Sequence, residues 1–176
     1  TTSCWNKSSN TKNDKTITDG QIKAKDLATG SNGLSGIQAI IKTVHGNIHF
    51  KFYPKEAPNT VTRIIHLIQK GFYDGLIFHR VIKNFVIQGG DPTGSGKGGS
   101  GISLKAEFNS IQHIKGTVAM ARGYDVDSAD SQFYIALATL PHLDKKYTVF
   151  GQVTKGLELL NKVQQGDKIL SISIAK

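Results

Sequence analysis

The segment from Phe78 to Asp91 sets one arginine among apolar and aromatic residues and then continues into a glutamine, two glycines and an aspartate. β-Branched and aromatic residues dominate on both sides of Lys83-Asn84, which is a turn signal, so the segment predicts two short β-strands. Side chains of a strand alternate between its two faces. Phe78, Arg80 and Ile82 are therefore expected on one face of the first strand.

In the second strand, Phe85 and Ile87 are expected on one face, and Val86 and Gln88 on the other. An arginine between apolar walls keeps its charge and its N–H donors, so a pocket around Arg80 can direct hydrogen bonds at a carbonyl or an amide group. The alternative is an ordinary edge-strand arginine, with its stem packed on the sheet and its head group in water. The pattern alone is compatible with both.

The length and composition of the chain fit one globular domain, because 176 residues that are 38% hydrophobic can bury a sizeable core. No apolar run approaches the ~20 residues that a membrane-spanning helix needs. The net charge of +9 favours acidic partners, but the lysines are scattered, so no dedicated nucleic-acid site is expected. One cysteine excludes an internal disulfide, and the six dispersed histidines form no metal-binding motif, so we expect no metal.

The regular part of the chain begins near Gly36, where apolar residues alternate on both sides of His45-Gly46-Asn47 and predict a β-hairpin. Apolar residues then recur at helical spacing between Pro58 and Gly71, which predicts one helix of about three turns; they are Val61, Ile64, Ile65 and Ile68. A second short helix is expected over residues 156–163. Further strand-like runs cover residues 117–121, 132–138, 148–153 and 169–174.

These elements amount to about eight short strands and two helices without β-α-β alternation, which favours an antiparallel barrel or sandwich capped by helices. Residues 94–99 also contain the pattern G-x-G-x-x-G. A nucleotide-binding loop would need a helix to begin there, but residues 102–108 show no helical stripe. We therefore predict a flexible backbone wall beside a binding groove.

The central segment resembles the signature of the cyclophilins, the peptidyl-prolyl cis-trans isomerases, through Phe78-His79-Arg80-Val81-Ile82, Phe85 and Gln88-Gly89-Gly90-Asp91. The likeness covers roughly residues 37–174 and is strongest to the bacterial branch. The resemblance implies a mainly β fold, a closed eight-stranded antiparallel β-barrel capped by two α-helices. Further along the sequence the resemblance rests on a series of spaced motifs, which are Gly98-Gly99, Glu107-Phe108, Met120-Ala121-Arg122, Ser131-Gln132-Phe133, His142-Leu143-Asp144 and Tyr147-Thr148-Val149-Phe150-Gly151.

The resemblance also implies the activity, which is rotation about X-Pro peptide bonds of unfolded or nascent proline-containing polypeptides, by a monomer without cofactor. Arg80, Phe85 and Gln88 would be the catalytic residues, with the guanidinium of Arg80 on the prolyl carbonyl. The remaining substrate-binding positions that it implies are Val86, Gly96, Ala121, Arg122, Gln132, Tyr134, His142, Leu143 and Tyr147. The alternative function is a weakly catalytic module that binds proline peptides.

The sequence departs from the family pattern at several of these positions. Val86 stands where methionine is common, Tyr134 where phenylalanine is usual, and Tyr147 where many members have histidine. His142 replaces a tryptophan that helps to bind cyclosporin, so we expect weak cyclosporin binding. Lys145 and Asp130 replace customary turn glycines, which predicts local backbone strain. His79 is expected to point away from Arg80 as a hydrogen-bonded structural histidine.

Residues 1–35 are predicted to be a flexible polar tail, and residues 36–176 the isomerase domain, because the tail has too few apolar residues to offset its ordering entropy. Cys4 followed by a polar tether is typical of an exported bacterial lipoprotein, although Thr1 stands where such signals have leucine. The hypothesis is a bacterial cell-envelope or periplasmic protein anchored through Cys4. The alternative is an incidental thiol on a cytoplasmic protein.

Overall fold

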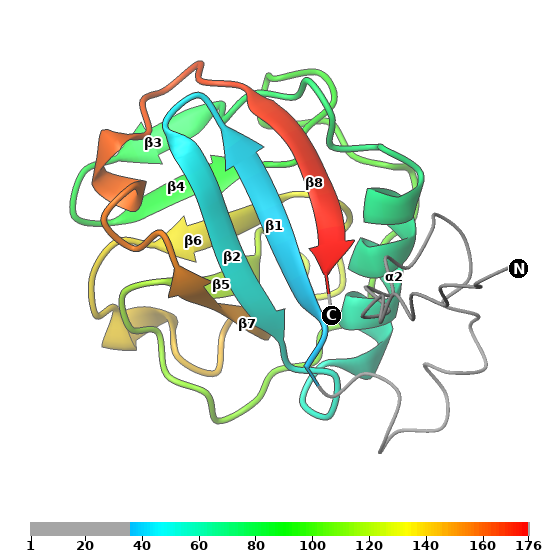
Figure 1. Ribbon diagram of the computed structural model, residues 1–176. Helices are drawn as coiled ribbons and strands as arrows, with labels where there is room; N and C mark the ends of the chain where they lie inside the picture. Colours follow the sequence, from blue (N-terminus) through cyan, green and yellow to red (C-terminus); the bar gives the residue numbers. More distant parts are fainter. Residues whose placement is uncertain (1–35, 176) are drawn as a thin grey trace, which may run out of the picture.

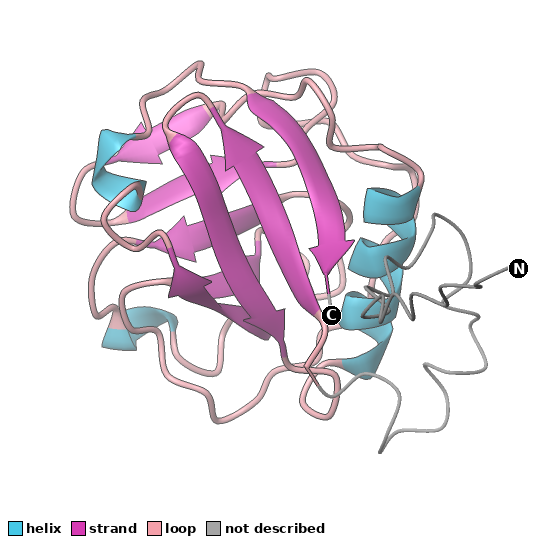
Figure 2. Cartoon of the chain, in the orientation of Figure 1, coloured by secondary structure: helices cyan, strands magenta, loops and turns pink. Residues whose placement is uncertain are grey.

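An eight-stranded antiparallel sheet curls around the hydrophobic core in the computed structural model, which describes residues 36–175 (Figures 1 and 2). The predicted tail, including Cys4, lies outside the described residues. The strand order in the sheet is β3-β4-β6-β5-β7-β2-β1-β8. The strands are β1 (Gln38–Thr43), β2 (Gly46–Phe52), β3 (Arg80–Ile82), β4 (Val86–Gly89), β5 (Thr117–Met120), β6 (Phe133–Ala136), β7 (Val149–Lys155) and β8 (Ile169–Ala175).

The predicted hairpin is confirmed by the pairing of β1 with β2, which runs from Gln38 opposite Lys51 to Thr43 opposite Gly46. Alternation places one side of each strand in the core, where the side chains of Ala39, Ile41 and Ile48 are fully buried. β8 pairs with the other edge of β1. Figure 1 shows β2, β1 and β8 side by side in one layer, with β3, β4 and β6 crossing behind them.

The predicted helix is also confirmed, as α2 (Pro58–Gln69), which buries the expected stripe of Val61, Ile64, Ile65 and Ile68. The backbone N–H groups of Asn59 and Thr60 in its first turn donate to the carboxylate of Glu107, at 3.0 and 2.9 Å. A carboxylate at that end satisfies otherwise unpaired donors and complements the helix dipole. Gly71, at φ +65°, ends the helix as expected.

The predicted second helix over residues 156–163 is wrong. That segment forms turns and a single 3₁₀ turn, η2 (Leu160–Lys162), and the chain becomes extended at Val163, with φ −64° and ψ 129°. Its helical run is shorter than the ~12 residues that stabilise a helix without tertiary support, and Leu157 and Glu158 are exposed. Two turn hydrogen bonds, from Leu159 to Gly156 and from Lys162 to Leu159, and the burial of Leu160 and Val163 hold the segment in place.

The expected closure of the barrel is also wrong, and the sheet is a half-barrel. Strands β3 and β8 are the two edges of the sheet, and an isolated bridge between Ile77 and Lys168 replaces a ladder between them. β3 is only three residues long and ends before the turn at Asn84, which has φ +59°. The contact between the two edges lies before β3, where the Phe78 N–H donates to the Asp167 carbonyl at 2.9 Å and the Ile169 N–H donates to the Leu76 carbonyl at 2.7 Å.

Candidate active site

The register of the sheet gathers the central site residues on one face. Arg80 lies opposite Gln88, Gln88 opposite Tyr134, and Tyr134 opposite Ala119, across β3, β4, β6 and β5. Residues directly opposite each other on paired strands share a face, so these side chains form one row on the outer face of the half-barrel. The neighbouring row, which includes Ile87, packs into the main core on the opposite face.

A second hydrophobic cluster, separate from the main core, lies at this row and is called the apolar slot below. Its buried members include Val86, at 2% exposure, and Tyr134, at 4%. Phe85, Leu143 and Tyr147 are half-buried and pack against them. The cluster therefore presents partly exposed apolar side chains around a buried apolar floor.

The rim of the slot is aromatic. The imidazole of His142 stacks on the ring of Phe85, with centroids 5.9 Å apart and planes inclined by 12°. Tyr147 meets Tyr134 edge to face at 5.7 Å. The guanidinium carbon of Arg122 lies 4.9 Å from the Tyr147 ring centroid, and its nitrogens donate to the carbonyl of Lys146 at 3.0 and 3.2 Å. The guanidinium of Arg122 therefore hydrogen-bonds within the protein and packs against the ring of Tyr147.

Arg80 begins a series of side-chain hydrogen bonds that leads away from the slot and is called the polar chain below. Its Nη1 donates to Gln88 Oε1 at 3.2 Å, and Gln88 Nε2 donates to Gln132 Oε1 at 2.9 Å. Gln132 Nε2 in turn donates to the carbonyls of Gly96 and Gly98, at 3.1 and 2.8 Å. The side-chain amides of Gln88 and Gln132 therefore both have their orientation fixed by their hydrogen-bond partners.

The guanidinium of Arg80 is exposed at the head of this chain. Its central carbon lies 5.8 Å from the ring centroid of Phe85, so both a hydrogen bond and a cation–π contact orient it. Arg80 is indeed an edge-strand arginine, as one of the two interpretations held, but its head group is held in place. The guanidinium therefore lies between Phe85 of the slot and Gln88 of the polar chain, and it contacts both.

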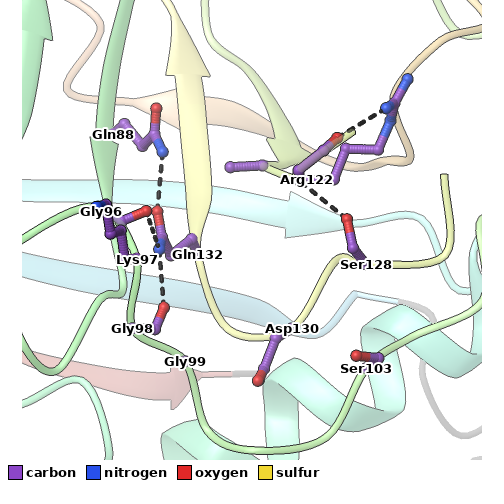
Figure 3. Close-up of a pocket in the computed structure, with 12 residues that line it drawn as sticks. Gln88, Gly96, Lys97, Gly98, Gly99, Ser103, Arg122, Ser128, Asp130 and Gln132 are labelled. Atoms are coloured by element: carbon purple, nitrogen blue, oxygen red, sulfur yellow. Dashed lines mark hydrogen bonds between the residues drawn. The ribbon is translucent and has the colours of Figure 1, made fainter. Parts of the chain in front are cut away.

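A polar cavity of about 440 Å³ adjoins the far end of the hydrogen-bond chain. Figure 3 shows Gln88 and Gln132 on one side of it and Ser128 and Asp130 on the other. Of the predicted site residues, it is lined by Gln88, Gly96, Ala121, Arg122 and Gln132, and the other seven lie at the slot or on its rim. Gln88 contacts both Arg80 and Gln132 and so links the two groups by hydrogen bonds; the two groups together are called the groove below.

The glycine-rich segment forms the predicted wall of this cavity, and a buried carboxylate holds it. Asp91, at 1% exposure, accepts hydrogen bonds from the backbone N–H and hydroxyl of Thr93, at 2.7 and 2.8 Å, and from the Gly96 N–H at 2.5 Å. A Cβ atom on Gly98 would overlap Asp91 Oδ1. Burial alone would raise the pKa of Asp91, but these hydrogen bonds and one from Gly98 outweigh it and lower the pKa to about 2.

A second carboxylate, Asp130, holds the far end of the same wall. It accepts the backbone N–H groups of Ser100, Gly101 and Ile102, at 2.9, 2.8 and 3.2 Å, and also the Ser100 hydroxyl. The backbone strain predicted at Asp130 is not found, because its φ is not positive. The strain predicted at Lys145 is found, because its φ is +60°. The wall is therefore fixed at both ends by acidic side chains.

The predicted orientations of Phe78 and Phe85 are wrong, and so is the predicted hydrogen bonding of His79. Phe78 and Phe85 lie outside β3 and β4, where strict alternation does not apply. Phe78 consequently packs into the main core, and Phe85 packs at the slot, opposite to Ile87. His79 lies beneath Gly96, but its buried ring nitrogens have no hydrogen-bond partner among residues 36–175, and burial lowers the pKa of its imidazole.

Asp91, Asp130 and His113 are not among the predicted site residues. Asp91-Pro-Thr93 carries a local signal, because an aspartate commonly accepts hydrogen bonds from the backbone two residues later. Asp130 and His113 carry none, since their partners lie far away in sequence. Within residues 36–175, no cluster of histidine, cysteine and acidic side chains is placed to hold a metal ion, and no helix is long and apolar enough to cross a membrane.

Comparisons with known proteins agree with this geometry. A family model described as cyclophilin type peptidyl-prolyl cis-trans isomerase/CLD matches residues 38–174. A peptidyl-prolyl cis-trans isomerase of Synechococcus elongatus is 44% identical over 139 residues, covering 78% of this chain and 95% of the relative. One from Helicobacter pylori is 43% identical over 156 residues, covering 86% of this chain and 91% of the relative.

Among solved structures, a cyclophilin type isomerase of Cryptosporidium parvum, determined in the presence of the dipeptide Ala-Pro, has a TM-score of 0.74 and 30% sequence identity. The similarity covers 79% of this chain and 99% of that one. The match therefore spans the half-barrel, α2 and the groove described above. The chain belongs to the cyclophilin-type peptidyl-prolyl cis-trans isomerases.

Proposed function

We propose that the groove isomerises X-Pro bonds with Arg80 as the catalytic group and the apolar slot as the binding site of the prolyl ring. The observation that carries this assignment is the guanidinium held by Gln88 and Phe85 at the boundary between slot and polar chain. In that position it can donate to the prolyl carbonyl of a ring bound in the slot. Phe85 and Gln88 hold it there and are the other catalytic residues.

The chemistry needs little more than this arrangement. Amide resonance gives the X-Pro bond a rotation barrier of about 18–20 kcal/mol, and uncatalysed rotation takes tens of seconds. In the transition state the nitrogen is pyramidal and no longer conjugated, so it can accept a hydrogen bond that planar nitrogen cannot. A donor fork such as Arg80 then binds the twisted state more strongly than either planar state, which is the condition for catalysis.

The proposed substrates are unfolded or nascent polypeptides that contain proline. Val86, Tyr134 and Leu143 would contact the ring, with His142 and Tyr147 at the rim. The backbone of Ala121 and Arg122, with Gln132 and Gly96, would hold the main chain beside the polar cavity. The Ala-Pro dipeptide named with the Cryptosporidium structure supports this substrate class. The chain is proposed to act as a monomer without a cofactor.

The alternative is a weakly catalytic module that binds proline peptides. A coupled protease assay on a short X-Pro peptide separates the two functions when it is run beside a binding titration of the same peptide. The proposed function predicts both saturable binding and isomerisation far above the uncatalysed rate. Saturable binding with isomerisation at the uncatalysed rate would favour the binding module.

Cyclosporin is expected to inhibit the isomerase only weakly. His142 stands where many members have tryptophan, and its imidazole is stacked on Phe85, so the large indole surface and its N–H donor are both missing. The measurement is an inhibition titration of the isomerase, with His142→Trp as the comparison. We expect His142→Trp to lower the inhibition constant by about tenfold or more. A low-nanomolar inhibition constant for the unaltered chain would contradict the prediction.

For location, we propose attachment to the bacterial cell envelope through a lipid on Cys4, which lies outside the described residues; a cytoplasmic form is the alternative. Metabolic labelling with a radioactive fatty acid tests this in a bacterial host, with Cys4→Ser as the control. Label and membrane association that both disappear in Cys4→Ser would support the anchor. An unlabelled chain in the soluble fraction would favour the alternative.

A further inference from the structure

His113 is a fully buried histidine that no step of the isomerisation uses. It nevertheless fastens both ends of the segment from Leu140 to Asp144. Its carbonyl accepts the N–H of Leu140 at 2.8 Å. Its own N–H donates to Asp144 Oδ1 at 2.7 Å, and its ring Nδ1 lies 2.9 Å from the same oxygen.

The fastened segment carries one wall of the slot. It contains the 3₁₀ helix η1 (Pro141–Leu143), which includes His142 and Leu143 and buries none of its own residues. Its other backbone bonds are local, from Leu143 to Leu140 and from Asp144 to Pro141. Leu140 is buried, and Leu143 and His142 pack on other slot residues, but the hydrogen bonds to His113 fasten both ends of the segment to the rest of the domain.

The second ring nitrogen of His113 reaches the floor of the same slot. Nε2 lies 2.8 Å from the hydroxyl of Tyr134, and the two rings are stacked at 6.0 Å. A carboxylate only accepts hydrogen bonds, so in the neutral imidazole Nδ1 carries the proton and Nε2 accepts from the Tyr134 hydroxyl. Burial raises the pKa of Tyr134, which keeps that hydroxyl protonated. Hydrogen bonds from the backbone and ring of His113 lower the pKa of Asp144, which keeps it charged.

We propose that His113 is a positioning residue that fixes the floor and the wall of the proline slot relative to each other, and so sets the affinity for the prolyl ring. It is buried beneath the floor and does not touch the substrate. The tyrosine at position 134 is essential to this role, because a phenylalanine there would have no hydroxyl to offer His113. The proposal rests on the proposed function, since it assumes that the slot receives proline.

The main test is Asp144→Ala, which releases the wall without changing a residue of the slot or the buried imidazole. The slot binds the prolyl ring in the ground state and in the transition state alike. The substitution leaves Arg80 on β3 in place, so the interaction specific to the transition state is kept. We therefore expect KM for an X-Pro peptide to rise about tenfold while kcat stays within about threefold. Asp144→Asn keeps an acceptor oxygen for both donors of His113, so it should restore most of the affinity.

A matched control distinguishes positioning from general stability. The pair of His45 and Asp167 also joins a histidine to a carboxylate, at 2.7 Å, and the Asp167 side chain is 22% exposed compared with 24% for Asp144. It ties the β1–β2 turn to the segment before β8, away from the slot. Asp167→Ala should lower the melting temperature and leave KM unchanged.

Tyr134→Phe provides a second variant that keeps the ring of the floor. Because it acts through the same imidazole, its effect on KM should be clearly less than additive with that of Asp144→Ala. An unchanged KM in Asp144→Ala, an equal rise in Asp167→Ala, or strict additivity would each overturn the proposal. Peptide affinity is measured in parallel by NMR titration, so that a chain without isomerase activity would refute the proposed function while the role of His113 is still tested.

Discussion

Replacing Arg80 by alanine is expected to lower kcat/KM for an X-Pro peptide by about two to three orders of magnitude, the usual cost of removing one donor aimed at a transition state. The guanidinium is the donor group at the boundary of slot and polar chain, and Gln88 and Phe85 hold it there. Arg80 is exposed on an edge strand, so the free energy of unfolding should change by less than about 1 kcal/mol.

Two further variants make this result specific to the guanidinium. Arg80→Lys keeps the charge but loses the planar fork, so we expect it to recover little of the lost activity. Lys42→Ala removes an exposed cation from β1, on a strand far from β3 in the sheet order, and should keep full activity. Near-normal activity in Arg80→Lys would show that the charge alone suffices and would contradict the assigned role.

Replacing Asp91 by alanine is expected to lower the free energy of unfolding by about 2–4 kcal/mol, because several donors of Thr93 and Gly96 would lose the buried carboxylate that accepts their hydrogen bonds. Asp91→Asn should cost nearly as much, since its NH₂ group would face one of those donors. The wall of the cavity would also loosen, so KM should rise. Urea unfolding measures the first effect and peptide kinetics the second.

The effect of Asp91 should depend on pH with a defined sign. Its pKa is lowered from 3.8 to about 2 in the folded chain, so its stabilisation is complete well above pH 4 and disappears as the pH falls through 2. The difference in stability between the unaltered chain and Asp91→Asn should therefore shrink as acid is added. Asp125→Ala is the control, because Asp125 is exposed and bonds only within its own turn. A difference that stays constant down to pH 2 would refute this account of the wall.

Local periodicity was sufficient to predict the elements that bury a continuous stripe. The spacing of Val61, Ile64, Ile65 and Ile68 identified α2, and alternation around Gly46 identified the β1–β2 hairpin. The helix expected over residues 156–163 failed because its pattern was too short for packing to be inferred from it. Closure of the barrel was predicted wrongly because no periodicity shows how far the two edge strands, β3 and β8, pair with each other.

The groove was predictable where its residues lie in strands and motifs, and unpredictable where pairing is distant in sequence. The register that aligns Arg80, Gln88 and Tyr134 follows from strands that the sequence located correctly. The carboxylates of Asp130 and Asp144 bind backbone groups about thirty residues away. No periodicity encodes such a contact, and only the folded chain reveals that these side chains shape the cavity wall and the slot.

The most direct test of the central claim is exchange NMR on a short Ala-Pro peptide with catalytic amounts of the chain. The account predicts strong cis–trans exchange peaks with the unaltered chain. It also predicts that Arg80→Ala still binds the peptide, shown by shifts of the slot residues, but no longer produces these peaks. Equal exchange with Arg80→Ala, or no exchange with the unaltered chain despite saturable binding, would contradict catalysis by this groove.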